Sequence, residues 1–115
     1  MKTKKANTIK KMLESISLNE LYAMYSNKHL DNKILKCILE KLSNSPDENA
    51  RYNAAKHPLA PEKLLKKLSS DRASVVRIAV SSHYNTPTSV LRSLIMDNST
   101  TVVFNATRKL KNREN

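Results

Sequence analysis

The stretch 43–105 repeats with a period of 26 residues, and this repeat constrains the fold more than any other feature of the chain. Arg51 and Arg77 occupy one position of the repeat, and His57 and His83 occupy another. The second half of each unit aligns prolines and apolar residues: Pro61 with Pro87, Leu64 with Val90 and Ile38, Leu65 with Leu91 and Leu39, and Leu68 with Leu94 and Leu42. A unit of this length buries its apolar face only by stacking on its neighbours. The repeat therefore predicts a solenoid.

Helix start and stop signals divide each unit into a pair of helices. Ser45 precedes Pro46 and is followed three positions later by Glu48, a pattern typical of an N-cap, a proline at the first helical position and a capping-box carboxylate. We therefore expect a helix over 46–56. It should end before Pro58, because the residue preceding a proline is pushed out of the helical region.

A second, short helix is expected after each turn. Pro61 and Pro87 stand at its start in consecutive units, and Thr86 is the better N-cap candidate. Apolar residues at i, i+1 and i+4 follow, as on one face of a helix. Two columns are expected to lie buried between units: Leu42, Leu68 and Leu94, and Tyr52, Ile78 and Phe104.

The repeat extends backward with less fidelity, through a turn two residues longer and a helix over 34–42. One degenerate unit, two good units and a terminal half unit result: 17–42, 43–68, 69–94 and 95–110. The diverged ends are expected to act as caps. The sequence thus predicts an all-α fold of about three stacked helix pairs, arranged as a basic N-terminal segment, a helical-repeat domain and a basic C-terminal tail: 1–16, 17–110 and 111–115.

The phrase from Asp71 through Val76-Arg77 and Pro87 to Leu94 resembles the leucine-rich repeat variant family, and the resemblance covers about 43–106. HEAT-like helical repeats share several of its positions. The resemblance implies a short right-handed α-solenoid of alternating α and 3₁₀ or short α helices, and implies little about activity. Some members carry an iron–sulfur segment. With Cys37 as its only cysteine, this chain cannot supply the four thiolates that such a cluster normally uses.

Arg51 and Arg77 are expected to contact Asp71 or Asp97 of the following unit, with a ligand contact as the alternative. A salt bridge of this kind contributes little to stability if it is exposed.

The aligned histidines His29, His57 and His83 could suggest a row of metal ligands. Neighbouring units stand about 10 Å apart, too far for ligands that must each lie about 2 Å from one zinc ion. We therefore expect these side chains to cap helices and pack in turns, and we expect no metal site and no cofactor.

No catalytic motif is present, and we do not expect an enzyme. The chain contains no glycine, which excludes a P-loop and a dinucleotide-binding loop. Cys37 lies in a Leu- and Ile-rich helix and is expected to be a small packed side chain rather than a nucleophile. The adjacent carboxylates of Asp47 and Glu48 are explained by the positive end of a helix dipole.

Charge is the property that points to a function. The chain carries a formal net charge of +11, of which residues 1–15 contribute +4 and residues 103–115 contribute +3. On 61–69, lysines lie opposite the leucine face. Repeat registration adds residues from neighbouring units, so the candidate binding residues are Lys41, Lys63, Lys66, Lys67 and Arg92 in the repeats and Lys4, Lys5, Lys10 and Lys11 at the N-terminus. The alternative is a solvated, solubilising face.

The sequence therefore predicts a non-enzymatic binding module that engages nucleic acid through phosphate-backbone electrostatics. The alternative is a protein–protein adaptor, or a small inhibitor or regulator, that docks on an acidic partner surface. No small-molecule substrate is expected. No apolar run approaches the roughly 20 residues that span a bilayer, so we expect no membrane partner. A cytoplasmic location is expected, and the composition resembles a bacterial or phage protein.

Overall fold

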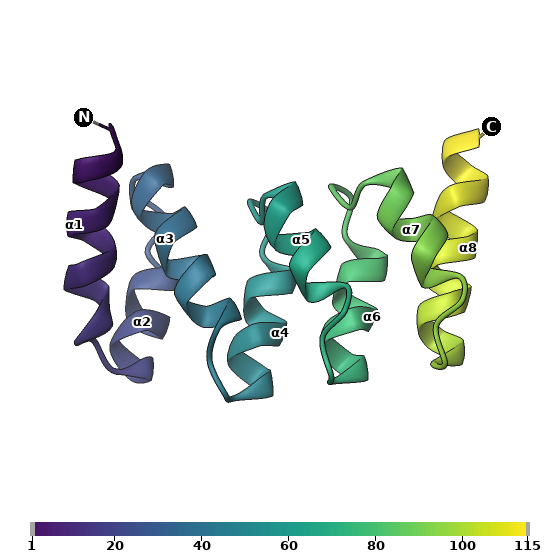
Figure 1. Cartoon of the computed structure of the whole chain (residues 1–115), viewed down its shortest axis with the longest axis horizontal. Helices are drawn as coiled ribbons and strands as arrows, with labels where there is room; N and C mark the ends of the chain where they lie inside the picture. The colour runs from purple at the N-terminus through teal and green to yellow at the C-terminus, as the bar shows by residue number, and fades with distance from the viewer. Residues whose placement is uncertain (1, 115) are drawn as a thin grey trace.

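The computed structural model describes residues 2–114, with side chains described from Asn7 onward, and within this range it contains helices and no strand. The helices are α1 (Lys2–Glu14), α2 (Leu18–Tyr25), α3 (Asn32–Ser43), α4 (Glu48–Lys56), α5 (Glu62–Leu68), α6 (Ser74–Ser82), α7 (Thr88–Leu94) and α8 (Thr100–Glu114). The predicted all-α class is confirmed. The helices follow one another along the longest axis of the molecule, with α1 and α8 at opposite ends (Figure 1). The molecule measures 41 × 28 × 23 Å.

Helices that begin a unit pack on one another across unit boundaries. α4 packs against α6, and α6 packs against α8. The second helices fill the other side of each unit, so that α3 contacts α2 and α4, α5 contacts α4 and α6, and α7 contacts α8. α1 packs against α3 and buries Leu13, which places a helix where the sequence indicated a basic N-terminal segment. At the other end, α8 continues through 111–114, within the stretch expected to be a basic tail.

The aliphatic column at the centre of the core is as predicted. Leu42, Leu68 and Leu94 are almost completely buried. The second predicted column is only partly right, because Phe104 is 63% exposed, although Tyr52 and Ile78 pack against the core. The reason is position: α4 and α6 are each covered by the next first helix, whereas no described helix covers the outer face of α8.

Two predicted N-caps are wrong. α4 begins at Glu48, and the side chain of Asp47 caps it by accepting a hydrogen bond from the backbone N–H of Asn49 at 2.9 Å. A carboxylate at this position also interacts favourably with the helix dipole, and Ser45 Oγ instead accepts from the N–H of Asp47. Thr86 is buried and its hydroxyl donates to the carbonyl of Val80 at 2.6 Å, so it does not cap α7.

Each arginine of the repeat pairs with the next unit, as predicted. The Nε of Arg51 lies 2.8 Å from Oδ2 of Asp71, and the Nε of Arg77 lies 2.8 Å from Oδ2 of Asp97. The first guanidinium also donates to the carbonyls of Ser45 and Pro46 at 2.9 Å. The Nη2 of Arg51 and that of Arg77 each lie 3.3 Å from Oδ1 of their respective partner aspartates, so the two pairs share nearly the same geometry.

His57 and His83 cap the C-terminal ends of α4 and α6, as predicted. The Nδ1 of each ring accepts a hydrogen bond at 3.0 Å from the backbone N–H two residues later. The Nε2–H of His83 donates to the carbonyl of His57 at 2.7 Å, which joins the two turns.

The alignment of His29 with these histidines is wrong. Asn27 occupies the equivalent place, since its Oδ1 accepts from the N–H two residues later. α2 ends at Tyr25, and the extra residues of the first unit lengthen α3, which begins at Asn32 rather than at residue 34. The first unit therefore differs from the others by added helix and not by a longer turn.

Candidate nucleic-acid interface

Side chains from three helices line a hollow of about 270 Å³ in the N-terminal half of the molecule. α1 contributes one lysine, α3 contributes a lysine, the cysteine and a glutamate, and α5 contributes two lysines. The complete lining is Lys10, Lys36, Cys37, Glu40, Pro61, Lys63, Leu64 and Lys67. Four ammonium groups thus surround one concave surface, with Glu40 as the only carboxylate among the described residues that line it.

The core sets the direction of these lysines. On α5, Leu64, Leu65 and Leu68 are buried. Lys63 and Lys67 lie one turn apart on the flank of this helix, and both are exposed as predicted. On α3, Lys36 and Glu40 are likewise one turn apart. The facing flanks of the two helices form the walls of the hollow.

Lys67 is held in place by neutral partners. Its ammonium group donates to Ser43 Oγ at 3.1 Å and to Asn44 Oδ1, both at the C-terminal end of α3. Both acceptors are neutral, and the nearby helix end carries the negative pole of the dipole. The side chain is therefore oriented and remains a net positive charge on the surface.

The remaining charges of the hollow are less constrained. Lys10 Nζ lies 3.5 Å from Oε2 of Glu40, and both side chains are about half exposed. A pair of this kind contributes little to stability. In the part of the chain that the structure describes, the ammonium groups of Lys36 and Lys63 make no hydrogen bond or ion pair. These two groups can bind an anion without breaking an existing contact.

The other predicted binding residues lie elsewhere. Lys66 is on the opposite flank of α5, where it lines a second hollow together with Ser89 and Ser93 of α7 but not with Arg92. Lys41 and Lys11 do not line the first hollow. The side chains of Lys4 and Lys5 lie outside the described residues. The structure thus brings Lys10, Lys63 and Lys67 together and leaves the other described candidates apart.

Sequence reasoning missed Lys36. In the 26-residue register this lysine aligns with the acidic Glu62, which suggested no basic column. Neighbouring helices meet through facing flanks rather than through equivalent positions. The i, i+4 spacing of Lys36 and Glu40, beside that of Lys63 and Lys67, was the available signal.

The positive surface has a boundary beyond α5. A neighbouring hollow shares Lys36 and Pro61 with the first and adds Glu62 together with the exposed ring of Tyr84. The carboxylate of Glu62 limits the basic region on this side. We therefore define the lysine hollow as Lys10, Lys36, Lys63 and Lys67, and keep this name below.

The residues that the structure describes hold no group of three or more His, Cys, Asp or Glu side chains placed to bind a metal ion. Cys37 is partly buried against the core, as expected of a packed side chain. None of the described helices is both long enough and apolar enough to cross a membrane.

Comparison with known proteins adds no identity to this geometry: no protein-family model, no curated protein and no solved structure matches the chain.

Proposed function

We propose that this chain is a non-enzymatic helical-repeat module that binds nucleic acid through the phosphate backbone, with the lysine hollow as its contact surface. One observation carries the proposal: among the described residues that line this concave surface, four lysines from three helices converge beside a single carboxylate. Lysine acts as a point charge toward phosphate and supplies no fixed pattern for reading bases. Binding is therefore expected to be nearly independent of sequence.

The proposal also covers the family, the cellular location and the origin of the module. Membership of the leucine-rich repeat variant family is supported by the recurring Arg–Asp pairs and by second helices of only seven residues in α5 and α7. A cytoplasmic location is supported by the lone cysteine, which suits a reducing compartment. A bacterial or phage origin rests on composition.

The test replaces the two lysines of the hollow that have no partner. Lys36→Glu/Lys63→Glu is compared with Lys28→Glu/Lys56→Glu, which changes the net charge equally at exposed positions outside the hollow. Fluorescence anisotropy with a labelled duplex of arbitrary sequence is measured from about 50 to 200 mM salt, the range over which phosphate contacts weaken most visibly.

The hollow variant should lose most of its affinity, and the slope of log K against log salt should decrease in magnitude by about 2, since each lost phosphate contact removes about 0.9. The control should keep the parent slope, because its lysines make no direct contact. Equal losses in the two variants would show that net charge alone attracts the duplex and would refute the hollow as the contact surface.

A further inference from the structure

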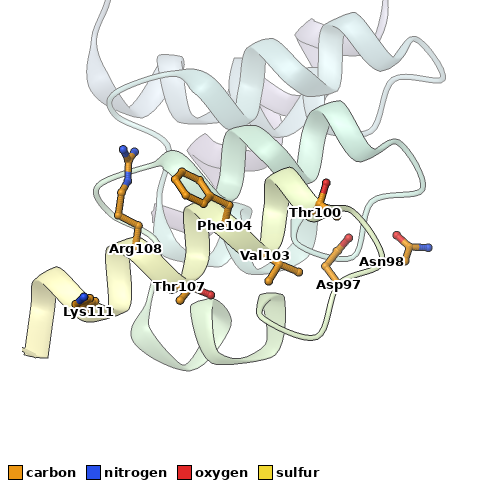
Figure 2. Close-up of a pocket in the computed structure, with 8 residues that line it drawn as sticks. All are labelled: Asp97, Asn98, Thr100, Val103, Phe104, Thr107, Arg108 and Lys111. Atoms are coloured by element: carbon orange, nitrogen blue, oxygen red, sulfur yellow. The ribbon is translucent and has the colours of Figure 1, made fainter.

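The outer face of α8 carries a second surface at the opposite end of the molecule from α1 (Figure 1). A groove of about 530 Å³ runs along this helix. Figure 2 shows the side chains that line it, arranged along α8 and on the loop before it: Asp97, Asn98, Thr100, Val103, Phe104, Thr107, Arg108 and Lys111. The α8 residues follow the spacing i, i+3, i+4, i+7, i+8 and i+11, which is one stripe of a helix.

The corresponding stripe on the first helix of an interior unit packs against the first helix of the next unit. Val103 and Phe104 stand one period after Arg77 and Ile78 of α6, and α6 packs against α8. On α8 the arginine of this position is replaced by Val103, so the ion pair that fastens one unit to the next has no counterpart here. An apolar stacking face remains, with Phe104 63% exposed.

The charges beside the apolar stripe restrict what can cover it. Arg108 and Lys111 line the C-terminal half of the groove, and the guanidinium of Arg108 lies 5.6 Å from the centre of the Phe104 ring. The carboxylate of Asp97 already accepts two hydrogen bonds from Arg77. The groove therefore offers uncompensated positive charge next to an exposed aromatic ring.

A second copy of this chain fits the groove poorly. The chain carries a net charge of +11, and Met12, the exposed apolar residue of α1, lies next to Lys11. Two basic end faces repel each other. A partner with apolar and acidic residues is complementary to both features of the groove.

We propose that the groove on α8 binds an amphipathic helix of a partner protein, whose apolar side covers Val103 and Phe104 and whose acidic residues pair with Arg108 and Lys111. A helix laid into a groove is a common way to recognise such a surface. The occupant takes the place that the first helix of a following unit would fill. This surface is distinct from the lysine hollow, so the module can hold nucleic acid at one end and a protein at the other.

The probe is a synthetic helical peptide of about 16 residues, or four to five turns, with a leucine stripe flanked by glutamates. A matched peptide carries glutamine in place of every glutamate. Binding of each labelled peptide is measured by fluorescence anisotropy. Nitrogen–proton NMR spectra of the full chain show which backbone amides respond.

The acidic peptide should bind and shift the amides of α8. Phe104→Asp should weaken binding at least about tenfold, as expected for a central aromatic contact, while Met12→Asp, an exposed apolar residue on α1, should change it little. Arg108→Glu/Lys111→Glu should strongly weaken binding of the glutamate peptide and should weaken binding of the glutamine peptide much less. Circular dichroism confirms that each variant folds.

Four results would overturn the proposal. One is that the acidic peptide does not bind at concentrations up to about a millimolar, and another is that it binds equally well to Phe104→Asp. A dimer of the parent chain that Phe104→Asp dissolves would assign the groove to self-association. A loss of duplex binding in Phe104→Asp, with no peptide binding by the parent, would assign the groove to nucleic acid.

Discussion

The two interior units and the two ends of the molecule follow different rules. In the interior, equivalent residues make equivalent bonds: the two Arg–Asp pairs share a distance of 2.8 Å, and the two histidine turns share a distance of 3.0 Å. At the ends, the same positions carry other residues. Val103 replaces the arginine, and Asn27 replaces the histidine.

This comparison distinguishes the residues that join one unit to the next from the residue found where no further unit is described. Arg51 and Arg77 occur in the units that have a following Asp71 or Asp97 to bind. Where α8 has no following unit in the described residues, a valine stands at this position. Val103 therefore stands at a position where an arginine would have no carboxylate of a following unit to bind.

The largest expected effect comes from breaking one interior pair. The side chains of Arg51 and Asp71 are 6% and 7% exposed, so Arg51→Met leaves a buried carboxylate without its guanidinium. A loss of about 3–5 kcal/mol in the free energy of unfolding is expected. Urea unfolding followed by circular dichroism measures it.

Two further variants sharpen this result. Arg51→Met/Asp71→Asn should be less destabilised than Arg51→Met alone, because the unpaired charge is also removed. Arg72→Met, in the same turn, should cost far less, since Arg72 is exposed and makes a single hydrogen bond to the carbonyl of Pro46. If Arg51→Met costs no more than Arg72→Met, the pairs do not fasten the units.

A leucine of the interior and the aromatic residue of the end should respond very differently. Leu68 is 1% exposed, and Leu68→Ala should cost about 2–5 kcal/mol through lost contacts and a cavity. Phe104→Ser should change stability by about 0.5 kcal/mol or less, as for exposed positions in general. Comparable losses from urea unfolding would mean that Phe104 is covered in solution.

These contrasts also explain how far the sequence could be interpreted. The helix pairs, the buried leucines and the Arg–Asp contacts follow from periodicity, because each depends on residues that recur. The exposure of Phe104 does not, since the same column is partly buried wherever another unit follows. The lysine hollow was only partly predictable, because Lys36 takes the repeat position of the acidic Glu62 and joins the hollow through the flank of α3 that faces α5.

The two N-cap predictions were wrong for different reasons. Ser45 and Asp47 both offer a capping oxygen within three residues, and sequence alone does not decide between them. Thr86 has the residue type of a cap, yet its burial requires its hydroxyl to find a partner inside the turn. Tertiary packing therefore decided the role of Thr86.

The smallest expected effect is a dependence of stability on pH, which should distinguish the interior histidines from the end. Burial lowers the pKa of His57 below its ordinary 6.5, and the nearby His83 lowers it further. Between the lowered folded-state pKa and 6.5, the folded protein therefore binds fewer protons than the unfolded chain. Stability should be complete above about pH 6.5, and should fall as the pH decreases through 6.5 toward the lower folded-state pKa.

A separate loss is expected in stronger acid. Burial alone would raise the pKa of Asp97, but hydrogen bonds from Arg77 and from the N–H of Ser99, with the charge of Arg77, hold it below 3.8. The stability contributed by this carboxylate is complete above pH 3.8 and decreases as the pH falls through the lower folded-state pKa. The two groups thus act in different pH windows and can be separated in one titration.

Melting temperatures at pH 7.5 and 5.5 test the histidine, because Asp97 stays charged at both. His57→Asn supplies the matched variant: an asparagine oxygen can accept the hydrogen bond from Leu59, as Asn27 accepts one in the first unit, but it does not titrate. The parent should lose stability between the two pH values, and His57→Asn should lose less. His29→Asn, at an exposed residue, should behave like the parent. An identical decrease in His57→Asn and the parent would assign the pH dependence to other groups and remove the distinction between the interior turn and the end.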